Sequence, residues 1–186
     1  MALILANRIN LHGNHQILDL QKQILNRFLK DIDQKNNSDT AVKRIFFGLN
    51  EDSEFDWTEK TGADWTYFQL RYENPLIFIS GFPTIKKLQD YITICASKID
   101  PNVVVQLDYE DSGGVLIGTR LTTYLDDSEV ESFEEEEYTP EAESRELSRS
   151  NMKAIKRNQL DEVRYQLINE LGEDFNRLKL VKSTYY

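Results

Sequence analysis

The chain has 186 residues, a hydrophobic fraction of 40% and a formal net charge of −10 at pH 7. This length suits one core domain with an appendage. Net negative charge disfavours a general nucleic-acid or anionic-membrane surface, because phosphates repel it, and it suits a basic partner. No apolar run is long enough for a transmembrane helix. The lone Cys95 cannot form a disulfide within the chain, and no signal-peptide pattern opens the sequence, so we expect a cytoplasmic protein without membrane contact.

The first half of the chain alternates between strand and helix patterns. Apolar residues at every second position predict a strand over 3–11. An apolar stripe at three- and four-residue spacing then predicts a helix over about 15–32. Residues 41–49, rich in apolar side chains, are interpreted as a second strand, and the acidic stretch 50–64 as irregular.

The middle of the chain predicts two hairpins around a second helix. Residues 65–72 and 76–80 flank a Glu-Asn-Pro turn signal and are interpreted as paired strands. A helix follows and ends before Pro101, because the residue before a proline avoids the helical conformation. Residues 103–109 and 115–124 then predict two strands joined by a tight Gly-Gly turn.

The order of these elements over 1–125 predicts an α+β, ferredoxin-like two-layer sandwich. The charge pattern separates this domain from the rest of the chain. From 126 to 146 there are eleven acids and one base, whereas the other residues balance 21 acids with 21 bases. Such a block repels itself and stays solvated. We therefore predict an acidic linker over 126–141 and a C-terminal amphipathic helix and tail over 142–186, with the helix spanning about 142–177.

The predicted C-terminal helix carries two stripes. Its apolar stripe predicts that it docks on the domain, on a partner or on a second copy as a homodimer, since an isolated helix is marginally stable in water. Its basic stripe steps by about four residues and is formed by Arg145, Arg149, Lys153, Lys156 and Arg157. Two interpretations stay open for the basic stripe: folding back onto the acidic run, or contact with an RNA backbone.

Several motifs in the first 120 residues resemble a known family. The strand Asn7-Arg8-Ile9-Asn10-Leu11-His12-Gly13 precedes a helix, and Trp57, Gly62 and Trp65 follow in order. A hairpin, a helix led by Pro83 and the stretch from Asp108-Tyr109-Glu110 to Gly118 complete the pattern. Residues 5–120 thus resemble phage and plasmid proteins with a YubB-type ferredoxin-like domain. The spacing between Trp57 and Trp65 is looser than the family's, and the acidic run lies outside the resemblance.

The resemblance implies a fold and a mobile-element origin, but no chemistry. Proteins from that setting often bind and disable a host machine. It therefore implies an inhibitor of a host defence or nucleic-acid-handling protein, and an anti-CRISPR protein acting on a CRISPR effector is the sharpest form of this hypothesis.

Few residues point to catalysis or to a metal. His12 and His15 have no cysteine nearby and no carboxylate at ligand spacing, so we interpret them as capping or surface residues. Cys95 falls on the apolar side of the second helix, where burial as a small hydrophobic residue is the better interpretation. We expect no cofactor and no resident metal.

A cluster of three carboxylates is the basis for the hypothesis that the protein is an enzyme. Asp108, Glu110 and Asp111 precede the last turn, and the first two point to one face of the strand. They could bind Mg²⁺ or act as an acid–base pair. The competing interpretation, which we favour, is a set of ordinary strand residues on an exposed face.

Two sets of residues are the candidate binding surfaces. Trp57, Trp65 and Tyr67 could stack single-stranded RNA on a sheet, although core packing is favoured because the strands lack the basic-aromatic pattern of such modules. The acidic run is either a solvated linker or a polyanion that binds a basic groove. Its candidate partner-binding residues are Glu131, Phe133, Glu134, Glu135, Glu136, Glu137 and Tyr138, where the two aromatic residues would supply anchors.

The sequence therefore predicts a non-catalytic binding protein whose partner is a host protein with a basic groove. An RNA-binding accessory protein, using the aromatic residues and the basic stripe, is the alternative. An Mg²⁺-dependent enzyme is the third hypothesis.

Overall fold

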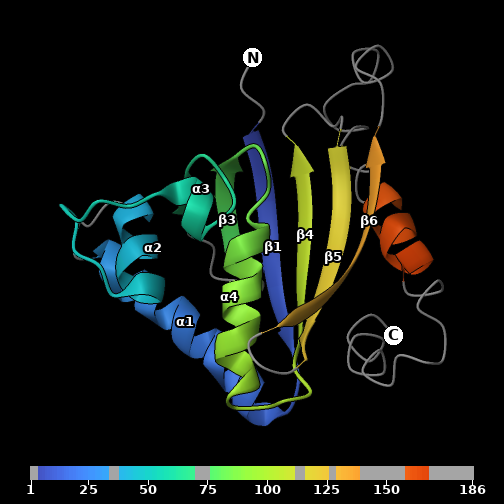
Figure 1. The fold of residues 1–186 in the computed structure, drawn as a ribbon, viewed down its shortest axis with the longest axis horizontal. Helices are drawn as coiled ribbons and strands as arrows, with labels where there is room; N and C mark the ends of the chain where they lie inside the picture. Colours follow the sequence, from blue (N-terminus) through green and yellow to red (C-terminus); the bar gives the residue numbers. More distant parts are fainter. Residues whose placement is uncertain are drawn as a thin grey trace.

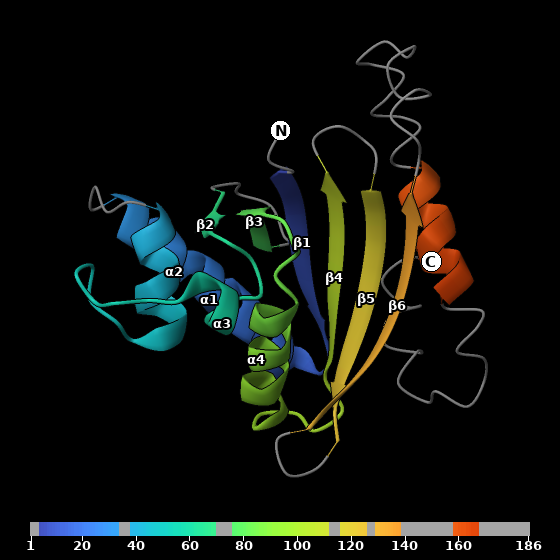
Figure 2. The same cartoon turned by 45° about the horizontal axis from the view of Figure 1, so that its top comes forward.

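The computed structural model describes residues 4–33, 38–69, 76–111, 116–125, 129–138 and 158–167. Within these ranges the fold is α+β, built on one six-stranded antiparallel sheet with strand order β2-β3-β1-β4-β5-β6 (Figures 1 and 2). The strands are β1 (Ile4–His12), β2 (Thr66–Phe68), β3 (Leu76–Gly81), β4 (Val104–Asp111), β5 (Leu116–Tyr124) and β6 (Val130–Tyr138). Four helices lie between or beside these strands in the described part of the sequence: α1 (His15–Asp33), α2 (Ser38–Phe47), α3 (Trp57–Lys60) and α4 (Lys86–Ser97). A further helical segment spans 158–167.

The main apolar core lies between one face of the sheet and helices α1, α2 and α4 (Figures 1 and 2). Alternate residues of β1 and β4 face this core, among them Ile9, Leu107 and Tyr109, which are fully buried. Phe28 of α1 stacks on Phe68 of β2 with 4.1 Å between ring centroids. Burial of each such side chain stabilises the fold by about 1.5–3 kcal/mol. The α-helical layer is therefore held to the sheet mainly by apolar packing.

Most of the predicted periodic elements are confirmed. The structure contains the predicted strand at 3–11 as β1 and the predicted helix at 15–32 as α1. The strands of the two predicted hairpins pair in antiparallel fashion as β2–β3 and β4–β5, whereas the predicted turns, within 70–75 and 112–115, lie outside the described residues. The helix that ends before Pro101 is α4.

The predicted strand at 41–49 is wrong. These residues belong mostly to α2, which spans Ser38–Phe47. Val42 and Phe46 lie four residues apart, as the apolar side of a helix requires, and Phe46 contacts Phe28 and Phe78. Packing against the core thus overrides the strand preference of β-branched and aromatic residues.

The predicted acidic linker is also wrong over 130–138. These residues form β6, which pairs with β5 from Leu116↔Tyr138 to Tyr124↔Val130. The sheet therefore continues past residue 125, where the domain was predicted to end. Glutamate is a poor strand former, but β6 lies at the sheet edge, where one side of the strand keeps its access to water.

The predicted C-terminal helix falls largely outside the described residues. Within it, 158–167 is helical, and Leu160, Val163 and Leu167 are buried. Arg164 contacts Asp108 of β4, whose side chain points away from the α4 layer because it alternates with Leu107 and Tyr109. The segment therefore packs on the opposite face of the sheet from α4, near β6 (Figure 2). Within the described ranges, no helix has both the length and the apolar character needed to cross a bilayer.

Candidate interaction edge

β6 forms one edge of the sheet and carries glutamates on both faces. Its register with β5 sets the two sides. Glu134 and Glu136 lie opposite Arg120 and Gly118, on the α4 side. The other three lie on the side of helix 158–167, which we call the back face: Glu131, Glu135 and Glu137. The acidic run is thus divided into two rows of carboxylates by the two-residue period of a strand.

The α4-side glutamates are bound by residues of the fold. The Tyr109 hydroxyl lies 2.6 Å from Glu134 Oε1 and 2.8 Å from Glu136 Oε2. A hydroxyl has one proton, so Tyr109 can donate to one of these carboxylates at a time. Burial raises the pKa of Tyr109 above its usual value, and the two carboxylates add to this, since ionised Tyr109 would be desolvated and repelled. Tyr109 therefore stays a neutral donor at physiological pH.

Glycine at position 118 makes this arrangement possible. A Cβ built on Gly118 would lie 2.3 Å from Tyr109 Cζ and Oη. The Tyr109 ring therefore lies directly over the Gly118 backbone and crosses β5 toward β6. Any side chain at residue 118 would occupy the space of this ring.

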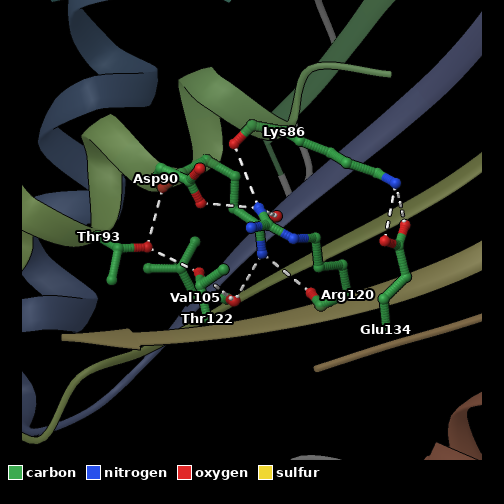
Figure 3. A network of polar contacts seen from close by, with 8 residues as sticks. Lys86, Asp90, Thr93, Val105, Arg120, Thr122 and Glu134 are labelled. Atoms are coloured by element: carbon green, nitrogen blue, oxygen red, sulfur yellow. Dashed lines mark hydrogen bonds and ion pairs between the residues drawn. The ribbon is translucent and has the colours of Figure 1, made fainter. Parts of the chain in front are cut away.

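Lys86 provides the positive charge on the same side. Its Nζ lies 2.6 Å from Glu134 Oε1 and 5.9 Å from the centroid of the Tyr109 ring. Lys86 opens α4, so this ion pair joins the helical layer to the sheet edge (Figure 3). The pair is partly exposed, at 39% for Lys86 and 27% for Glu134, and therefore contributes at most about 1 kcal/mol.

Arg120 fixes the position of α4 relative to β5. Its Nη1 donates to Asp90 Oδ1 at 2.7 Å, Gln89 Oε1 at 3.0 Å and the Lys86 carbonyl oxygen at 3.3 Å (Figure 3). Gln89 donates in return to the carbonyl oxygens of Val105 and Arg120. These bonds hold the first turn of α4 over the sheet, and they place Lys86 opposite Glu134.

The back-face glutamates differ from those on the α4 side. Glu131, Glu135 and Glu137 are half-buried, and among the described residues none of them forms an ion pair. Residues two apart on a strand are about 7 Å apart, so Glu135 and Glu137 are close neighbours. This row leaves a negative charge that the described part of the fold does not balance.

Two predicted aromatic anchors lie in β6. Phe133 is half-buried and faces Leu121 on the back face, so it packs within the protein rather than extending from an acidic linker. The backbone of Tyr138 pairs with Leu116, and the structure does not describe the Tyr138 side chain. The basic residues Arg145, Arg149, Lys153, Lys156 and Arg157 also lie outside the described residues.

The predicted aromatic surface is divided between two places. Trp65 and Tyr67 stack with 5.8 Å between ring centroids, and the Trp65 ring lies against Gly81. Trp57 belongs to α3 and contacts Phe55, with Lys43 Nζ 5.7 Å from its ring centroid. Only the first pair lies at the β2 edge, so these three residues do not form one stacking platform.

The carboxylate cluster of the enzyme hypothesis is engaged in structural contacts. Asp108 is fully buried and accepts from Arg164 Nη2 at 2.5 Å and from Thr119 Oγ1 at 2.8 Å. Glu110 shares the face of Asp108 and forms an ion pair with Arg8. Asp111 accepts from the backbone nitrogen of Leu116 at 3.0 Å. Sequence reasoning could not find Arg164, because 56 residues separate it from Asp108.

The two histidines and the cysteine have separate environments. His12 is buried, with Nε2 2.8 Å from Gln106 Oε1, whereas His15 is exposed at the start of α1. Cys95 is half-buried on α4. Among the described residues no group of three or more His, Cys, Asp or Glu side chains is placed to hold a metal ion.

No protein-family model, curated protein or solved structure matches this chain.

Proposed function

We propose that this chain is a non-catalytic binding protein that inhibits a host nucleic-acid-handling protein by presenting β6 to a basic groove. The observation that carries the proposal is the position of Glu131, Glu135 and Glu137. They follow one side of an edge strand, and they form no ion pair among the described residues. A row of carboxylates on a rigid strand needs little ordering on binding, unlike the same residues in a flexible linker.

Electrostatics support a partner that normally binds nucleic acid. A negative row attracts a positively charged groove, accelerates association and competes there with phosphate groups. The remainder of the chain has balanced charge, so the field is concentrated around the acidic run. The basic residues between 145 and 157 are a proposed second contact, through the partner or its RNA.

We also propose that the core of the fold is ferredoxin-like. The strands before β5 follow the order β4-β1-β3-β2, every neighbouring pair is antiparallel, and helices follow β1 and β3. This order supports the ferredoxin-like assignment, with β5 and β6 as an extension of the sheet. In this proposal the extension is what carries the binding edge.

The resemblance to YubB-type domains supports a phage or mobile-element origin. In that setting a host defence protein is the expected target, and a CRISPR effector is the sharpest candidate because it holds nucleic acid in positively charged channels. A proposed cytoplasmic location agrees with such a target.

An RNA-binding accessory protein is the second candidate. The stacked pair of Trp65 and Tyr67 at the β2 edge favours it, because both rings are only half-buried and aromatic rings on a sheet can stack bases. Trp57 lies apart from this pair, so fewer aromatic rings are available to stack bases than the RNA-binding hypothesis assumed. The enzyme hypothesis loses support for a different reason: Asp108 is neutralised by Arg164 and Glu110 by Arg8.

The test compares three full-length chains as baits in nuclease-treated host lysate: wild type, Glu131→Gln/Glu135→Gln/Glu137→Gln, and Glu51→Gln/Glu54→Gln/Glu59→Gln. The last variant removes the same charge from exposed residues far from β6 in sequence. We expect a protein captured by the wild type and by the control, and lost from the β6 variant. Its association rate, measured with the purified partner, should fall steeply with salt concentration.

Equal capture by all three chains would contradict the role of β6. Partners that disappear after nuclease treatment, together with a gel shift of single-stranded RNA at low salt, would favour the RNA-binding candidate.

A further inference from the structure

Helix 158–167 is docked on the sheet by a short pattern of side chains. Leu160, Val163 and Leu167 are 6%, 1% and 4% exposed, and their spacing places them on one side of the helix. Arg164 lies on the same side and reaches Asp108. The ten described residues of this helix would have little stability alone in water, so these contacts with the sheet hold them in place.

The contact between Arg164 and Asp108 selects which helix can occupy this position. Arg164 donates to both carboxylate oxygens of Asp108, through Nη2 at 2.5 Å and Nε at 3.2 Å. Thr119 and Gln106 also donate to Asp108, at 2.8 and 2.9 Å. A fully buried carboxylate without a cation is costly. A helix lacking arginine at this place would therefore dock poorly.

The surface beneath the helix has an unusual composition for a buried face. We call it the β4–β5 back face; its side chains include Gln106, Asp108, Ile117, Thr119, Leu121 and Thr123. On the α4 side, β4 instead presents Val105, Leu107 and Tyr109. Because Gln, Asp and Thr side chains bind water readily, the back face tolerates exposure far better than the apolar core does.

The order of the elements along the chain also permits the helix to leave. The helix follows β6, the last strand that the structure describes, so it can separate without moving any described strand. Local openings of this kind cost less free energy than global unfolding.

We propose that the β4–β5 back face is a helix-binding site, occupied in cis by 158–167 and open to a partner's amphipathic helix that carries one arginine in its apolar stripe. The required pattern is apolar, apolar at +3, arginine at +4 and apolar at +7, as in Leu160, Val163, Arg164 and Leu167. This is recognition of a helix through its apolar face, with the arginine adding specificity. The cis helix competes at high effective concentration, so binding is weak until it is loosened.

The experiment uses the full chain and a fluorescein-labelled, helix-stabilised peptide with the sequence of 158–167. Peptide binding is measured by fluorescence anisotropy to wild type, to Arg164→Gln and to Arg164→Gln/Asp108→Asn. Loss of a charge-assisted contact changes affinity by about tenfold or more. We therefore expect Arg164→Gln to bind the peptide at least about tenfold more tightly than wild type, and the double variant to lose that gain. A peptide with glutamine in place of its arginine should bind Arg164→Gln at least about tenfold more weakly than the parent peptide does, because it lacks the charge-assisted contact with Asp108.

Hydrogen exchange on the same chains separates local release from unfolding. We expect faster exchange of the 158–167 amides in Arg164→Gln, with β4 and β5 unchanged. Tyr165→Phe is the matched control on the same helix, since Tyr165 is 59% exposed, and it should behave as wild type in both measurements.

Three results would overturn the proposal. The first is an absence of peptide binding to Arg164→Gln while its sheet remains protected from exchange. The second is equal acceleration of exchange in the helix and in the sheet, which would make the helix part of the cooperative core. The third is a concentration-dependent dimer of Arg164→Gln, which would assign the site to a second copy of the chain.

Discussion

The residue type allowed at position 118 depends on the ring of Tyr109 that lies over it. We expect Gly118→Ala to destabilise the protein by about 1–3 kcal/mol, because the new methyl group would displace a buried ring that crosses β5. Urea denaturation measures this cost. In a Tyr109→Leu background the ring is absent, so the same substitution should cost much less. An equal cost in both backgrounds would mean that the ring is not what excludes a side chain at residue 118.

His12 makes the free energy of unfolding depend on pH. Burial lowers the pKa of His12, and its hydrogen bond with Gln106 and the charge of Asp108 oppose this only in part. The unfolded chain then binds a proton more readily than the folded chain as the pH falls through about 6.5, so the free energy of unfolding decreases on acidification.

The measurement is urea denaturation between pH 7.5 and 5.5. We expect His12→Gln to flatten the decrease in unfolding free energy, while the matched control His15→Gln, at an exposed position, retains the slope of the wild type. Identical slopes for the wild type and His12→Gln would exclude His12 as the source.

At the scale of whole elements, α4 and β5 are joined by Arg120. Its side chain is 10% exposed, and its loss would leave Gln89 Oε1 and the Lys86 carbonyl oxygen without this donor. We expect Arg120→Met to destabilise the protein by about 1–3 kcal/mol. Lys86→Met, which removes a more exposed ion pair, should cost at most about 1 kcal/mol. Thermal denaturation of both variants tests this order, and a reversed order would contradict it.

The sequence predicted correctly those elements that bury a single face, because burial of one face leaves apolar residues at regular spacing. β1, α1 and α4 are examples, since each packs one side on the main core. The segments 41–49 and 130–138 differ from prediction because their surroundings decide their structure. Phe46 needs Phe28 and Phe78 around it to favour a helix, and the β6 glutamates need Tyr109 and Lys86 across the sheet to favour a strand.

The sequence predicted which residues belong to the candidate site, but it did not predict how they are arranged. The sequence identified Glu131–Glu137 as a candidate binding element, and the structure assigns these residues to an edge strand. The division into two rows follows from the register with β5, which no local pattern specifies. The contacts of Glu134 join residues 25 and 48 positions apart, so composition alone could not predict them.

At the scale of the whole molecule, the two ends of the sheet are protected in different ways. β2 is an edge of three residues, short enough to offer few backbone groups to another chain. β6 is an edge of nine residues and would be a strong template for pairing between molecules. Its glutamates repel a second copy of the same edge, so the acidic run keeps molecules apart in addition to any role in binding.

This double role predicts what happens when the back-face charges are removed. We expect Glu131→Gln/Glu135→Gln/Glu137→Gln to self-associate at concentrations where the wild type does not, because a long edge strand that has lost its back-face charges repels a second copy less strongly. Light scattering over a concentration series measures this, with Glu51→Gln/Glu54→Gln/Glu59→Gln as the control of equal charge. Association of both variants would indicate an effect of net charge alone. If neither variant associates, the β6 glutamates are not needed to block edge pairing. Binding is then left as the explanation for a row of carboxylates that forms no ion pair among the described residues.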